Sequence, residues 1–115
     1  MGVVVSTTNK YQECIDACAK CAQACCECFK ACLNEPDVQA RTKCIAHLAE
    51  CARMCEMAVS MMSSESMHAK EFCGLCAAMC EACSAECAKF KNEHCSKCAE
   101  VCRVCAQECR AMSGM

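Results

Sequence analysis

The chain has 115 residues, a net charge of −2 with neutral histidines, 20 Cys, 9 Met and no Trp. This length suits one domain spanning residues 1–115, and the slightly acidic balance excludes the basic face that a nucleic-acid partner requires. No apolar run approaches the roughly 20 residues that span a bilayer, and the N-terminal residues lack the apolar stretch of a secretory signal. We therefore expect a cytoplasmic protein with no membrane partner.

The first predicted element is a helix over about residues 9–33. Its main cysteines follow one another at steps of 4, 3, 4, 3 and 4 residues: Cys14, Cys18, Cys21, Cys25, Cys28 and Cys32. Steps of three and four residues place side chains along one face of a helix, here called the seam. Cys26 lies beside this seam and is left out of the candidate site. Pro36 cannot continue the helix and ends it.

The second predicted helix covers about residues 37–62 and carries fewer cysteines. Its seam holds Cys44, Cys51 and Cys55, with His47 or Leu48 at the position between the first two. The third helix, over 64–91, has steps of 3, 4, 3 and 4 through Cys73, Cys76, Cys80, Cys83 and Cys87. The fourth, over 93–112, repeats these steps through Cys95, Cys98, Cys102, Cys105 and Cys109.

The connections between these four helices are short, so sequential helices must run antiparallel. The expected fold is all-α, an antiparallel up-down-up-down four-helix bundle. All four cysteine seams then face one axis, which predicts a Cys-lined core.

So many thiols on helix seams predict metal binding. In a reducing compartment disulfides are disfavoured, and Cβ atoms three or four residues apart on a helix, about 5–6 Å, are too distant for a disulfide. Cu(I) is soft, prefers Cys and Met, and accepts two or three thiolates. Helical neighbours offer such pairs repeatedly: Cys14–Cys18, Cys21–Cys25, Cys28–Cys32, Cys51–Cys55, Cys76–Cys80, Cys83–Cys87, Cys98–Cys102 and Cys105–Cys109.

Charge balance favours Cu(I) over Zn(II). If all 20 thiols ionise, about five Zn(II) ions with four cysteines each would leave roughly ten uncompensated negative charges in the core. About one Cu(I) per thiol would leave none. Bridging thiolates would weaken this argument, so general Zn or Cd sequestration stays open as an alternative, as does a thiol redox protein.

The candidate ligands for multiple Cu(I) ions are the nineteen seam cysteines, with additional candidates among the His and Met residues. His47 lies on or beside the second seam, while four others gather at one end of the expected bundle as a possible copper mouth: Met61, Met62, Met67 and His68. Flexible filling of a core poor in aromatic residues is the alternative for the methionines. For His94, next to Cys95, a solvated position near a helix start is favoured over a ligand.

These residues resemble the bacterial copper storage proteins, in particular their cytosolic branch. The resemblance rests on Cys14-x3-Cys18-x2-Cys21-x3-Cys25, on the Cys73–Cys87 ladder and on the Cys95–Cys109 ladder. It implies a bundle folded before metal arrives, a tube of mostly two-coordinate Cu(I)–thiolate sites, and a homotetramer. It also implies storage or detoxification without enzymatic turnover, with a copper donor or acceptor protein as a candidate partner.

Overall fold

The structure is a computed structural model that describes residues 9–114. Residues 1–8, which hold the N-terminal stretch examined for a secretory signal, and residue 115 lie outside the described range. The described part contains four α-helices, α1 (Gln12–Leu33), α2 (Thr42–Ser63), α3 (Ala69–Cys87) and α4 (Glu93–Ser113), together with one short 3₁₀ helix, η1 (Val38–Arg41).

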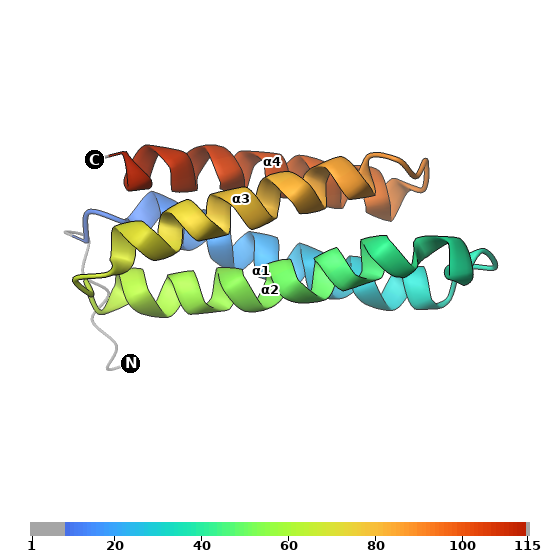
Figure 1. Ribbon diagram of the computed structural model, residues 1–115, viewed down its shortest axis with the longest axis horizontal. Coiled ribbons are helices and arrows are strands. Elements are labelled where there is room, and N and C mark those ends of the chain that lie inside the picture. Colours follow the sequence, from blue (N-terminus) through green and yellow to red (C-terminus); the bar gives the residue numbers. More distant parts are fainter. Residues whose placement is uncertain (1–8, 115) are drawn as a thin grey trace, which may run out of the picture.

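The four helices form an elongated antiparallel bundle (Figure 1). Helix α1 packs against α2 and α4, and α3 packs against the same two helices. This arrangement confirms the predicted all-α up-down-up-down bundle. Between residues 9 and 114, no helix is both long and apolar enough to cross a membrane.

The core contains sulfur and small side chains in place of the usual aliphatic ones. Apart from cysteine, its buried hydrophobic residues are Tyr11, Leu48, Met62 and seven alanines. Alanine favours the helix and leaves space beside the helix axis, so the cysteines fill the centre. The core is therefore made of the same residues as the candidate metal site.

Helix α1 begins at Gln12, three residues later than expected, because Asn9 to Tyr11 form a turn. The Asn9 side-chain oxygen accepts a hydrogen bond from the Tyr11 amide at 2.8 Å. The Asn9 amide group donates to the Met62 carbonyl at 3.4 Å, which joins the start of α1 to the end of α2.

The expected start of the second helix at residue 37 is wrong by five residues. Residues Val38–Arg41 form the 3₁₀ helix η1, and α2 begins at Thr42. The carboxylate of Asp37 does not cap the helix; it accepts a hydrogen bond from Arg41 Nε at 2.7 Å. A 3₁₀ turn commonly precedes an α-helix, and here it directs Arg41 towards the core.

The third helix is shorter at both ends than the predicted range 64–91. Residues 64–68 form a turn in which Glu65 has a φ of 50°, a conformation that an α-helix does not allow. The helix ends at Cys87, and the chain then turns so that the Phe90 ring lies over the Arg41 guanidinium, 4.5 Å from the ring centroid.

Candidate metal centre

Nineteen of the twenty cysteines point into the bundle, and each of these is at most 1% exposed. The twentieth, Cys26, is exposed on the outer side of α1. The nineteen are all the seam cysteines identified from spacing: Cys14, Cys18, Cys21, Cys25, Cys28, Cys32, Cys44, Cys51, Cys55, Cys73, Cys76, Cys80, Cys83, Cys87, Cys95, Cys98, Cys102, Cys105 and Cys109. The Cys-lined core is thereby confirmed.

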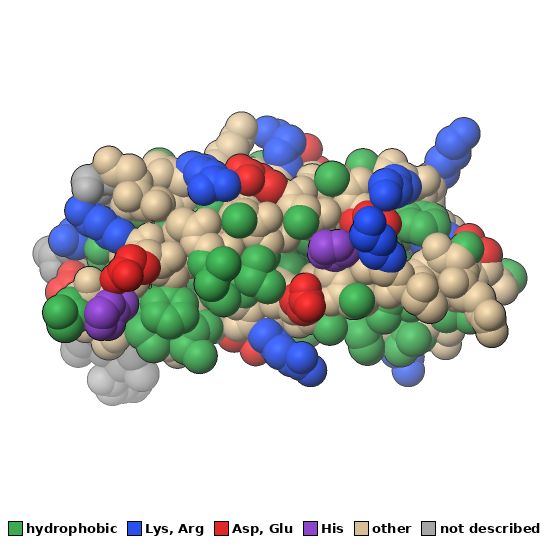
Figure 2. Space-filling view, in the orientation of Figure 1, with side chains coloured by type: hydrophobic (Ala, Val, Ile, Leu, Met, Phe, Trp, Pro, Cys, Tyr) green, Lys and Arg blue, Asp and Glu red, His purple; other side chains and the backbone are tan. Residues whose placement is uncertain are grey.

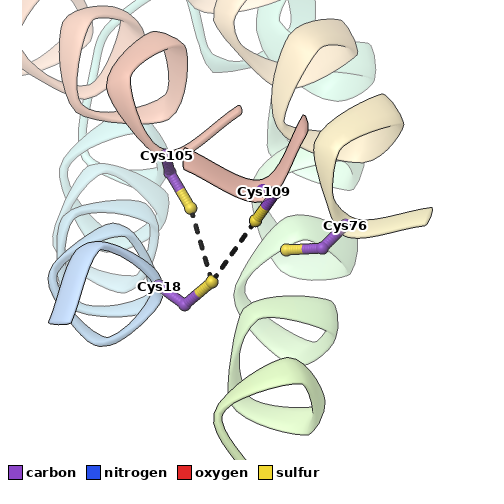
Figure 3. Close-up of side chains that lie close together, drawn as sticks. All are labelled: Cys18, Cys76, Cys105 and Cys109. Carbon is purple, nitrogen blue, oxygen red and sulfur yellow. Dashed lines mark hydrogen bonds between the residues drawn. The ribbon is translucent and has the colours of Figure 1, made fainter. Parts of the chain in front are cut away.

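Near the α1 N-terminus, thiols from three helices meet. The Cys18 sulfur lies 3.6 Å from those of Cys105 and Cys109 on α4, and Cys76 of α3 points into the same space (Figure 3). The sulfurs of these four residues all lie within 4.8 Å of one another. Cys14 adds a further contact with Cys109 at 3.6 Å. Three helices thus supply one potential metal site.

In the middle of the bundle, Cys21 contacts thiols from every helix. Its sulfur lies 3.6 Å from that of Cys102 on α4 and 4.0 Å from those of Cys25, Cys51 and Cys80. Cys21 belongs to two of the groups that could hold a metal ion, so adjacent sites share it. Such sharing allows bridging thiolates and a chain of neighbouring metal ions.

The shortest sulfur contacts run between helices, which the spacing argument did not foresee. Of the predicted pairs within one helix, Cys21–Cys25 is separated by 4.0 Å, and three others by 3.9 Å: Cys28–Cys32, Cys76–Cys80 and Cys98–Cys102. Contacts of 3.6–3.7 Å join different helices, such as Cys51–Cys80 and Cys44–Cys87. The heptad pattern specifies the seam but not which seams face each other most closely.

These separations suit soft-metal coordination. Metal–sulfur bonds of about 2.3 Å imply sulfur–sulfur distances of about 4.0 Å for three ligands in a plane and about 4.6 Å for two in a line. The observed contacts of 3.6–4.0 Å fit the first arrangement, and small rotamer changes would give the second. The tube can therefore accept both coordination numbers that Cu(I) uses.

Mutual hydrogen bonding and burial shift the thiol pKa values in opposite directions within one group. Hydrogen bonding with Cys102 lowers the pKa of Cys21, whereas hydrogen bonding with Cys105 and Cys18 raises the pKa of Cys55. Burial raises the pKa of Cys32 to about 11, against the opposing effect of the Arg41 guanidinium. Buried thiols beside a thiolate thus keep their protons, and metal must displace them.

Arg41 is a feature of the site that spacing gave no means of finding. It is 3% exposed, and its Nη1 donates to the sulfurs of Cys95 at 3.3 Å and Cys32 at 3.7 Å. Its other hydrogen bonds go to Asp37 and to the Asn92 side chain. The guanidinium therefore closes one end of the thiol tube with a fixed positive charge.

His94 also contributes to this end, contrary to the solvated position favoured from sequence. Its Nδ1 lies 3.3 Å from the Cys28 sulfur and 3.5 Å from the Cys95 sulfur. Its Nε2 contacts the Glu35 carboxylate at 2.9 Å. The sequence did show that His94 is adjacent to the first cysteine of the α4 ladder. It could not show that the C-terminal end of α1 packs against His94.

His47 does not join the described sulfur groups. The buried position on this part of α2 belongs to Leu48, which is fully enclosed, while His47 is half-buried and lies near Glu86. Of the two residues that the heptad allowed at this position, the aliphatic one faces the core.

The four residues expected at the copper mouth do not form a ring. Met62 is fully buried, Met61 is half-buried, and Met67 is 90% exposed. His68 is exposed and hydrogen-bonded to Glu71 at 2.9 Å. The turn between α2 and α3 holds Met67 and His68 away from the thiols.

Comparisons with known proteins agree with this geometry. Residues 7–114 match the family described as copper storage protein. The cysteine-rich protein YhjQ of Bacillus subtilis (strain 168) is 45% identical over 85 residues, which cover 73% of this chain and 79% of YhjQ.

Two solved structures are similar over nearly the whole chain. The Cu(I)-bound copper storage protein BsCsp3 of Bacillus subtilis is 46% identical, with a TM-score of 0.85 and coverage of 90% of this chain and 99% of that one. A cytosolic copper storage protein from Streptomyces lividans, solved with five coppers, is 38% identical, with a TM-score of 0.88 and coverage of 91% and 92%. The chain therefore belongs to the copper storage protein family.

Proposed function

We propose that the chain takes up and stores many Cu(I) ions on the nineteen interior thiols. The observation that carries this proposal is the overlap of thiol groups along the bundle, in which the ligand atoms of each group lie within 4.8 Å of one another. Neighbouring groups share Cys105, Cys21 or Cys28, or are joined by the contact between Cys98 and Cys102 at 3.9 Å. Copper-loaded relatives, one with Cu(I) and one with five coppers, support the choice of metal. The family description names storage, which supports a binding role without catalytic turnover.

Charge supports Cu(I) as the stored ion. Among residues 9–114, the only buried charged side chains are Arg41 and Glu86, so the middle of the tube has no cation of its own. Thiolates there need about one positive charge each from the metal, because an unpaired buried charge is costly. A monovalent ion supplies this ratio, whereas tetrahedral Zn(II) sites would leave excess negative charge.

Anaerobic titration of the reduced protein with Cu(I), in competition with a chelator, tests the proposal. We expect uptake of about one Cu(I) per interior thiol, since that ratio neutralises the core. The double substitution Cys21→Ser and Cys102→Ser should lower the capacity, while Cys26→Ser, on the exposed thiol, should leave it unchanged. Saturation at about three ions or fewer would contradict storage, because so few would not fill the thiol ladder.

We further propose that copper reaches the thiols from the end that contains Met62. At the opposite end, the Arg41 guanidinium lies against the sulfurs of Cys32 and Cys95 and fills the end of the tube. Met62 is the one buried thioether of the four predicted mouth residues, so it is best placed to pass an ion to the thiols. Met62→Leu should slow copper uptake and leave the final capacity unchanged; an unchanged rate would contradict this role.

We also propose a cytoplasmic homotetramer. The Streptomyces lividans relative described as cytosolic supports the location. Figure 2 shows apolar side chains gathered among charged ones on one face. A surface hollow is lined by Met54 and Met57 of α2 and by Phe72 and Met79 of α3. Exposed apolar patches of this kind commonly mark protein contacts. Light scattering should give four times the chain mass, and Met57→Glu should lower it.

A further inference from the structure

At the Arg41 end, three sulfurs and one imidazole nitrogen form a compact four-atom group. The sulfurs of Cys28, Cys32 and Cys95 are separated by 3.9–4.0 Å. His94 Nδ1 lies 3.3 Å and 3.5 Å from two of them, and all four atoms are within 4.8 Å of one another. A tetrahedral Zn(II) ion with bonds of about 2.3 Å to sulfur and 2.05 Å to nitrogen would require separations of about 3.8 Å and 3.5 Å. The group already has nearly these dimensions.

The imidazole is held in the orientation and tautomer that a metal ligand needs. The Glu35 carboxylate can only accept, so His94 Nε2 carries the proton and donates it to Glu35 at 2.9 Å. The lone pair of Nδ1 then faces the sulfurs. A carboxylate behind the far nitrogen is the usual support of a metal-bound histidine.

Arg41 changes the charge that a metal ion must carry to neutralise this group. Three thiolates and a neutral imidazole carry three negative charges, and the buried guanidinium on Cys32 and Cys95 removes one. The carboxylates of Asp37 and Glu35 lie at the rim, where water screens them. Two negative charges therefore remain inside, which one divalent ion neutralises.

The other groups that could hold a metal differ in this respect. They consist of cysteine alone, as in Cys21, Cys25, Cys51 and Cys102, and no buried cation among residues 9–114 lies beside them. A divalent ion with four thiolates there would leave two negative charges in a buried site. Charge thus separates the end group from the rest of the tube.

We propose that Cys28, Cys32, His94 and Cys95 form a Zn(II) site, which is occupied in the copper-free protein and from which Cu(I) displaces the Zn(II) ion when the thiols are filled with copper. A surface hollow of about 210 Å³ lined by Cys28, His94 and Cys98 gives the ion a route to the site. The bound ion would join the end of α1 to the start of α4 before any copper arrives. This site does not depend on the storage function proposed above.

Metal analysis of the reduced, copper-free protein after incubation with Zn(II) and gel filtration tests the site. We expect one Zn(II) per chain, and with Co(II) as a substitute ion, the intense visible bands of a tetrahedral thiolate site. Glu35→Gln should weaken Zn(II) binding about 10–100-fold through the loss of its support to His94. The matched control Glu13→Gln, on an exposed residue at the opposite end, should change nothing.

His94→Ala decides whether the ion is at this site. We expect this variant to lose the retained Zn(II) and the Co(II) bands while keeping the helical circular dichroism spectrum of the parent. No retained Zn(II) in the parent, or equal retention in His94→Ala, would overturn the proposal, since the ion would then be absent or bound by cysteines alone. Cu(I) capacity is measured separately, so failure of the Zn(II) site and failure of copper storage are distinguishable.

Discussion

The sulfurs of Cys51 on α2 and Cys80 on α3 lie 3.6 Å apart, although 29 residues separate them in the chain. Each of them also contacts Cys21 on α1, at 4.0 Å. A metal ion bound here would be held by side chains from three helices. Sites of this kind share ligands, so the loss of one thiol changes its neighbours without removing them.

Cys51→Ser should lower Cu(I) capacity by only a few ions. The substitution removes one ligand from a shared group, and the remaining thiols keep their contacts. Anaerobic titration followed by metal analysis measures the change, with Cys26→Ser as the control that retains full capacity. Complete loss of function from this single change would instead favour a redox protein that depends on one cysteine pair.

The protein stripped of both copper and zinc should lose stability between about pH 9 and pH 11. Burial raises the pKa of Cys32 from its ordinary value of 9.0 to about 11, and hydrogen bonding with Cys14 together with burial raises the pKa of Cys73. Unfolded thiols ionise near pH 9 while these two stay protonated, so the folded state has the greater proton affinity. Their contribution is therefore complete below pH 9 and falls as the pH rises.

Urea unfolding of the reduced protein, freed of copper and zinc by a chelator, at a series of pH values would measure this loss. The free energy of unfolding should fall steadily across the interval. Constant stability up to pH 11 would show that the interior thiols ionise as easily in the folded chain as in the unfolded one.

Copper loading should release protons, about one for each Cu(I) at neutral pH, because the ion binds thiolate and the interior thiols are mostly protonated. Titration with Cu(I) in weakly buffered solution, with base added to hold the pH, counts them. It follows that copper binding should weaken as the pH falls. Loading without proton release would mean that the thiols were already ionised.

The bundle was predictable because its cysteines repeat at helical spacing, and the side chain of every seam cysteine is buried. The structures at the ends of the bundle could not be predicted in this way. Arg41 enters the core through a 3₁₀ turn in which it contacts Asp37 and Phe90, and neither of these residues belongs to the cysteine repeat. Likewise, the heptad allowed either His47 or Leu48 at one position, and the choice depended on which side chain the neighbouring helices could enclose.

Leu48→Ala should destabilise the copper-free protein by about 2–5 kcal/mol, the usual cost of emptying a buried leucine position. Leu48 is fully enclosed in a core with few other large aliphatic side chains. Leu75→Ala is the matched control, because Leu75 is 51% exposed and its loss should change stability by no more than about 0.5 kcal/mol. Chemical denaturation of both variants measures the difference, and equal effects would contradict the core position of Leu48.

In this bundle the core side chains that hold the helices together are also the ligands of the stored metal ions. Thiols that touch across α1, α2, α3 and α4 become, in the loaded protein, points at which metal bonds staple one helix to the next. The bound copper ions therefore stabilise the loaded protein, whereas the copper-free protein depends on weak packing between sulfur atoms. Removal of copper must accordingly make the bundle more flexible, so the copper-free state is also the one that admits new copper ions most easily.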